Sequence, residues 1–136
     1  MFKISNENIY NYHFLAALNQ LSNQRFPIRV GWNISRIYKQ CQVLEKKLRE
    51  QVKEFADASF AKDEKGNFQP LMIDERPVPD KFIELKEGDQ KIFDDKVANL
   101  MGGESELKSD LIDIKDVAET EMTPTDLGTL QALFKV

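Results

Sequence analysis

The chain has 136 residues, of which 41% are hydrophobic and 31% are charged, and its net charge is −4. This composition fits one globular domain and excludes a wholly disordered chain. No run of residues approaches the roughly 18 consecutive apolar residues that a membrane span needs, and a single cysteine, Cys41, excludes an internal disulfide.

The charge is unevenly distributed along the chain. Residues 1–70 hold 11 Lys and Arg against 7 Asp and Glu, whereas residues 71–136 hold 8 against 16. The two halves are therefore expected either to pack together with complementary surfaces or to offer one charged face to a partner. The N-terminus lacks the basic segment and apolar core of a secretory signal, so we expect a cytoplasmic protein.

The first elements predicted are a short strand and a helix. Phe2 and Ile4 lie on one side of an edge strand, and Ser5 or Asn6 is suited to cap the helix that follows. Apolar residues at helical spacing extend this helix to about Asn23.

A second, much longer helix is predicted from Pro27 to about Ala61, which corresponds to roughly 50 Å at 1.5 Å per residue. Its apolar residues have a heptad-like spacing over Val30, Ile34, Ile37, Cys41, Leu44 and Leu48. The first helix covers only about half of this length. The apolar stripe from Leu48 to Phe60 therefore needs another cover, either the C-terminal part of the chain or a second molecule. Close packing is the expected reason for Gly31.

Residues 62–87 are predicted as an extended loop. Gly66 and Asn67 favour a turn, and Pro70, Pro77 and Pro79 exclude a helix or a central strand. A short strand over Leu71–Ile73 is compatible with these prolines.

The last third is predicted as helix, strand and helix. The stretch "DQKIFDDKVANLMGG" favours a helix that Gly102 and Gly103 end, and the alternation in "SDLIDIKDV" favours a strand. In the final helix Thr123 is the expected N-cap, Pro124 the first helical residue and Asp126 the partner in a capping box.

These elements predict an α+β, helix-dominated fold, with an N-terminal helical hairpin that has one long helix, a small β-sheet and two shorter helices. We expect a single domain over 1–136, made of the hairpin at 6–61, the proline-rich loop at 62–87 and the helix–strand–helix part at 88–136.

The chain has few residues suited to catalysis. With one His and one Cys it cannot build a zinc site from several such ligands, and it contains no phosphate-binding glycine loop. Cys41 lies within the apolar stripe, and His13 is expected to have a structural or surface role. Asp80, Asp113 and Lys115 resemble the pattern of metal-dependent nucleases, which would require both carboxylates on neighbouring strands. Similar acidic-x-Lys triplets occur elsewhere in the chain, so we expect no catalytic residue, cofactor or metal.

A run of basic residues follows the long helix, comprising Arg25, Arg29, Arg36, Lys39, Lys46, Lys47, Arg49 and Lys53. Such a stripe could follow the phosphates of a nucleic acid, which makes nucleic-acid binding an alternative function. Glu45 and Glu50 interrupt it, and the acidic second half of the chain is available to neutralise it.

The order of elements resembles that of small accessory proteins of tailed bacteriophages and prophages. The resemblance rests on the start of the long helix, "RFPIRVGWNISRI", on the turn "KDEKGNF", and on a strand such as "DLIDIKDV" before a capped helix, "MTPTDLGTLQALF". It implies a phage-encoded, non-enzymatic protein of the host cytoplasm or of the virion, which binds a host protein or serves in assembly.

The function favoured by these observations is protein–protein interaction. The predicted contact is the uncovered part of the long helix, with Trp32 and Arg36 as rim or anchor residues. Its centre is expected at Leu48, Val52, Phe55 and Phe60. The partner is either a host or phage protein, or a second copy that associates through the long helix.

Overall fold

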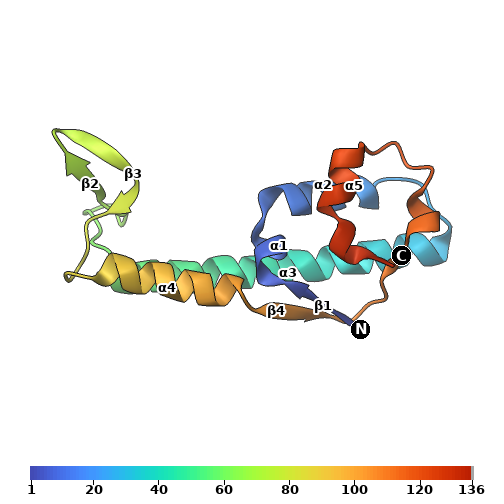
Figure 1. The fold of residues 1–136 in the computed structure, drawn as a ribbon, viewed down its shortest axis with the longest axis horizontal. Helices are drawn as coiled ribbons and strands as arrows, with labels where there is room; N and C mark the ends of the chain where they lie inside the picture. Colours follow the sequence, from blue (N-terminus) through green and yellow to red (C-terminus); the bar gives the residue numbers. More distant parts are fainter. Residues whose placement is uncertain (136) are drawn as a thin grey trace. The chain divides into compact units, whose positions relative to one another are not determined.

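The computed structural model describes residues 1–135 and shows an α+β, helix-dominated fold with 55% helix and 20% strand (Figure 1). This confirms the predicted fold class. The described residues group into two compact units. The first comprises Met1–Leu48 and the chain from Met101 onward, and the second comprises Arg49–Leu100. The expectation of one folding domain stays a prediction.

The N-terminal strand β1 (Phe2–Ser5) pairs antiparallel with β4 (Glu104–Leu107), with Phe2 opposite Leu107. The sequence did not predict β4, because its residues, Glu-Ser-Glu-Leu, have little strand propensity and its partner lies about a hundred residues earlier. The side chain of Ser5 accepts a hydrogen bond from the backbone of Asn8 at 3.2 Å, as expected of an N-cap.

Two helices stand where one was predicted, α1 (Asn6–Tyr10) and α2 (Tyr12–Ser22). Asn11 separates them because its backbone is extended, with ψ 121°, and its side chain accepts a hydrogen bond from the His13 backbone at 2.9 Å. Asn11 thus ends the first helix and caps the second.

The long helix α3 (Ile28–Ser59) has 32 residues and begins directly after Pro27, close to its predicted bounds. In the first unit its buried face contributes to the core, together with side chains of α2. The side chains with 1% exposure or less include Phe14, Leu18, Leu21, Ile34, Ile37 and Cys41.

The C-terminal part of the first unit differs from the prediction. The strand expected over 109–117 is only β5 (Ile112–Asp113), which pairs in parallel with β6 (Phe134–Lys135). The Asp113 side chain accepts a hydrogen bond from the Lys115 backbone at 2.9 Å and begins the 3-10 helix η1 (Ile114–Val117). Ile114 is therefore 46% exposed instead of continuing the buried face.

The predicted cap of the last helix is confirmed. Thr123 accepts a hydrogen bond from the Asp126 backbone at 3.1 Å, and α5 (Pro124–Thr129) begins with the proline. The helix contacts α2 and continues into η2 (Gln131–Leu133).

In the second unit, the predicted loop at 62–87 is largely a β-hairpin. Strands β2 (Pro70–Ile73) and β3 (Arg76–Phe82) pair antiparallel, and α4 (Asp89–Met101) follows them. Both strands of a two-stranded sheet are edge strands, where proline's missing N–H is tolerated. The described strands form three separate two-stranded sheets, where the sequence predicted a small β-sheet without its division.

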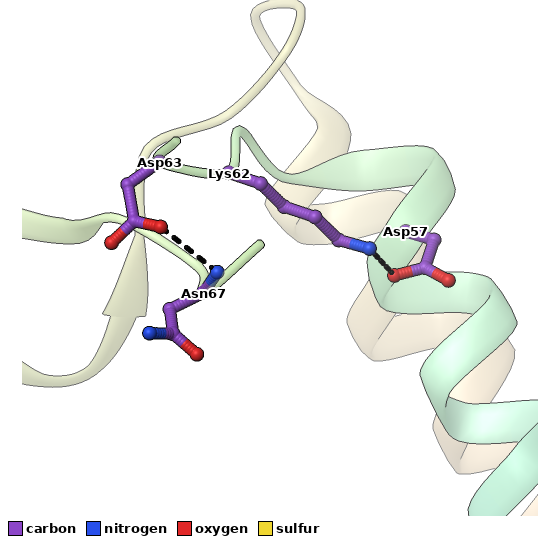
Figure 2. A network of polar contacts seen from close by, with 4 residues as sticks. All are labelled: Asp57, Lys62, Asp63 and Asn67. Carbon is purple, nitrogen blue, oxygen red and sulfur yellow. Dashed lines mark hydrogen bonds and ion pairs between the residues drawn. The ribbon is translucent and has the colours of Figure 1, made fainter. Parts of the chain in front are cut away.

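The turn that precedes the hairpin agrees with the prediction. Asp63 accepts hydrogen bonds from the backbones of Lys65 at 2.9 Å and Asn67 at 3.0 Å, and Gly66 has a φ of 80°. Beside it, Lys62 Nζ lies 2.6 Å from Asp57 Oδ1, which ties the turn to the last turns of α3 (Figure 2).

Candidate functional site

Later parts of the chain cover the apolar stripe from Leu48 to Phe60, which is one of the two covers that the sequence left open, so the stripe is not the free contact surface that was expected. Phe60 is only 2% exposed, because aromatic rings surround it. The ring of Phe93 on α4 lies 5.0 Å from its ring centre, that of Phe82 on β3 lies 5.5 Å away, and that of Phe68 lies 6.3 Å away. Phe60 is a core residue of the second unit and does not offer a contact surface.

The other residues of the predicted centre are also wholly or partly covered. Leu48 is buried, and Val52 and Phe55 are half-buried. The ammonium group of Lys96 on α4 lies 5.6 Å from the centre of the Phe55 ring. The expectation of an uncovered stripe is therefore wrong. The cover was missed because the loop that was expected at 62–87 supplies Phe68 and Phe82.

The other two predicted contact residues, Trp32 and Arg36, are exposed, unlike those of the predicted centre. Trp32 is 71% exposed, and Ile28, one turn earlier on α3, is 73% exposed. Arg36 is exposed one turn later, and its guanidinium donates a hydrogen bond to the backbone carbonyl of Lys108 at 3.4 Å.

These residues belong to a continuous exposed face of α3, which we call the basic–apolar face. Its members recur at steps of three or four residues and are Ile28, Trp32, Arg36, Lys39, Val43 and Lys47. No Asp or Glu occurs between Glu7 and Glu45. Among residues 1–135, no carboxylate forms an ion pair with a cation of this face. Its positive charge is therefore available to a partner.

A mainly apolar groove of about 310 Å³ adjoins this face, within the first unit. Its lining comprises Lys39, Gln40, Val43, Leu44, Glu106 and Lys108. The side chain of Gln40 holds the groove in place, because its oxygen accepts a hydrogen bond from the Lys108 backbone at 2.7 Å and its nitrogen donates one to Ser109 Oγ at 2.7 Å. A fixed apolar groove is suited to receive an apolar side chain.

An acidic surface segment, residues 110–121, flanks the beginning of α3. The Asn33 side chain donates a hydrogen bond to the Asp110 carbonyl at 2.9 Å and accepts one from the Asp110 backbone at 3.3 Å. Leu111 and Ile114 are exposed apolar residues within this segment. Its exposed carboxylates are those of Asp110, Asp113, Asp116, Glu119 and Glu121. Nothing in the spacing of these residues predicted their position beside α3.

The structure does not contain the arrangement that the nuclease pattern requires. Asp80 lies on β3, which pairs with β2, and Asp113 lies on β5, which pairs with β6. The two carboxylates are therefore not on neighbouring strands, and Asp113 caps η1 instead. Among residues 1–135, no three His, Cys, Asp or Glu side chains are placed to hold a metal ion.

Cys41 and His13 have environments that match the sequence-based expectation. Cys41 is fully buried, and this burial raises the pKa of its thiol to about 12, so the reactive thiolate does not form near neutral pH. His13 is an exposed residue of α2, where its ring lies 5.8 Å from that of Tyr12.

Comparison with protein-family models, with curated proteins and with solved structures finds no match to this chain. None of the helices within residues 1–135 combines the length and the apolar character needed to cross a membrane.

Proposed function

We propose that the protein acts by binding another protein and not by catalysis, and that the basic–apolar face of α3 is the contact. The observation that carries this proposal is the exposure of Trp32 beside Ile28, in a row that continues to Val43. Exposed aromatic and aliphatic side chains gathered on one face are typical of protein interfaces, and Trp and Arg dominate their binding energy.

The resemblance to phage accessory proteins further suggests where the protein comes from and where it acts. In that setting the chain is phage-encoded and works in the host cytoplasm or in the virion. Its partner is a host or phage protein, or another copy of itself.

Nucleic-acid binding is a second candidate because the same face combines cations with an exposed indole. Cations attract phosphates, and an exposed Trp provides a surface on which a base can stack. Such binding would weaken steeply as the salt concentration rises, and nuclease treatment would abolish it. Ile28 and Val43 favour the protein partner, because aliphatic side chains gain little from phosphates.

The test compares proteins captured from a nuclease-treated lysate by the tagged wild-type chain and by two variants. Trp32→Ser removes the proposed anchor. Tyr12→Ser is the matched control, because Tyr12 is a 74% exposed aromatic residue on α2, outside this face. We expect Trp32→Ser to lose a stoichiometric partner that Tyr12→Ser retains. Equal capture by both variants would exclude the basic–apolar face, and capture that disappears with nuclease would favour the nucleic-acid candidate.

A further inference from the structure

We infer that the basic–apolar face binds a second copy of this chain in a two-fold symmetric pair, with Trp32 of each copy in the groove beside Val43 of the other. This inference rests on the proposed function and names the partner. It follows from an exposed apolar side chain, an apolar groove of matching size and two surfaces of opposite charge, all within the first unit.

Trp32 and Val43 are placed so that two copies can engage each other reciprocally. They are eleven residues apart, about three helical turns, so both lie on the same side of α3 at a separation of about 16 Å along its axis. When two such helices cross antiparallel about a two-fold axis midway between these positions, each Trp32 meets the partner's Val43. A self-complementary surface of this kind is the requirement for an isologous dimer.

The groove is suited to receive an indole. Its volume of about 310 Å³ is enough for one large aromatic side chain, and its walls include the aliphatic parts of Val43 and Leu44. Gln40 fixes one wall through its hydrogen bonds to residues 108 and 109. The groove is open to solvent on one side, and an aromatic anchor packed against such an apolar surface is a typical centre of a protein interface.

Opposite charges meet at the two ends of this arrangement, whereas Arg36 and Lys39 of both copies lie near its centre. The acidic surface segment flanks the start of α3, where Asn33 holds Asp110, and Lys46 and Lys47 are exposed at the other end of the face. An antiparallel pair brings the acidic segment of one copy to the lysines of the other. These contacts would lie at the solvent-exposed edge of the interface, so salt is expected to weaken them.

The test is a disulfide cross-link between two variants that each add one cysteine, Trp32→Cys and Val43→Cys, mixed under oxidising conditions. The native Cys41 is fully buried with a thiol pKa of about 12, so it does not compete. In the mixed pair one Trp32 still enters an unmodified Val43 groove, which preserves half of the contact. We expect the mixture to form a cross-linked dimer, whereas Trp32→Cys alone forms none, because its two cysteines would lie about 16 Å apart along the helix axis.

Charge variants provide a second measurement that leaves both apolar partners intact. Lys46→Glu with Lys47→Glu is expected to weaken dimerisation at least tenfold in sedimentation equilibrium. The added changes Asp110→Lys and Asp116→Lys in the same chain are expected to restore most of it. Lys62→Glu, in the second unit, is the control and should leave dimerisation unchanged.

Three results would overturn the inference, namely a wild-type chain that stays monomeric at high micromolar concentration, a mixture without cross-links, or Trp32→Cys that cross-links efficiently to itself. The capture experiment separates this failure from failure of the proposed function. A monomer that still captures a partner through Trp32 refutes the second copy alone, whereas a monomer indifferent to Trp32 refutes both.

Discussion

A methyl group added at Gly31 would meet only the Cβ atom of Phe26, at 3.9 Å, which is an ordinary van der Waals contact. Close packing therefore does not explain this glycine, contrary to the sequence-based expectation. Because glycine in a helix is destabilising relative to alanine, we expect Gly31→Ala to raise the free energy of unfolding by about 0.5–1 kcal/mol in urea denaturation. A loss of stability would show that the first turns of α3 are packed more closely than described.

Because the thiol of Cys41 is buried, we expect the protein to become less stable in alkaline solution. Burial raises the thiol pKa from 9.0 to about 12, so between these values the unfolded chain loses a proton that the folded chain keeps. The free energy of unfolding is therefore unaffected by this thiol below pH 9. It falls as the pH rises from 9 towards 12, by about 1.4 kcal/mol for each pH unit. Denaturation at several pH values, compared with Cys41→Ala, isolates this contribution from other titrating groups. Equal slopes for both proteins would contradict it.

Truncation of Phe60 is predicted to destabilise the protein strongly, whereas truncation of Trp32 is predicted to have almost no effect on stability. Phe60→Ala should lower the free energy of unfolding by about 3–5 kcal/mol, because it leaves a cavity among Phe68, Phe82 and Phe93. Trp32→Ala should change it by no more than about 0.5 kcal/mol, because the side chain is largely exposed. Denaturation of both variants decides between core and surface roles. A large loss for Trp32→Ala would contradict the assignment of this residue to a binding face.

The turn of the β2–β3 hairpin is strained by its sequence. Asp74 and Glu75 have φ values of 50° and 63°, as a two-residue hairpin turn of type I′ requires, and glycine is strongly preferred at the second position. We expect Glu75→Gly to stabilise the second unit by about 1 kcal/mol, measured by hydrogen exchange of the hairpin amides. Arg76→Gly, a strand position, is the matched control and should weaken protection. Unchanged or lower protection in Glu75→Gly would contradict the described turn.

Elements governed by local signals were predictable, and elements formed by distant partners were not. Pro27 and Thr123 mark helix starts by their own chemistry, so α3 and α5 were predicted close to their observed starts. The pairing of β1 with β4 depends on contacts across most of the chain, and alternation near Ile112 did not reveal that Asp113 would begin a 3-10 turn. The hairpin was missed because its prolines, which exclude a central strand, are tolerated in a two-stranded sheet.

The candidate site was only partly predictable for the same reason. Trp32 and Arg36 were identified because Trp and Arg are among the residue types that dominate the binding energy of protein interfaces. The groove beside Val43 could not be predicted, since its other wall comes from Glu106 on the unpredicted strand β4 and from Lys108 directly after it. Phe60 was misassigned because two of the rings around it, those of Phe68 and Phe82, come from a segment that was expected to be a loop.

At the scale of the whole molecule, the structure shows strong positive charge on one face of α3, although the net charge is −4. In the proposed pair Arg36 and Lys39 of both copies lie near the two-fold axis, where their like charges oppose association, whereas the acidic segment and the lysines attract each other at the two ends. Association is therefore expected to be specific in register and to weaken with salt, without being abolished, because the indole contact is not electrostatic.

The fluorescence of Trp32 tests the proposed contact most directly, because it is the only tryptophan in the chain. We would record its emission spectrum from nanomolar to high micromolar protein concentration. The proposed contact predicts emission typical of a water-exposed indole in dilute solution and a shift to shorter wavelength as the chains associate, absent in Val43→Arg. An emission maximum that is already that of a buried indole in dilute solution, or that does not move with concentration, would contradict it.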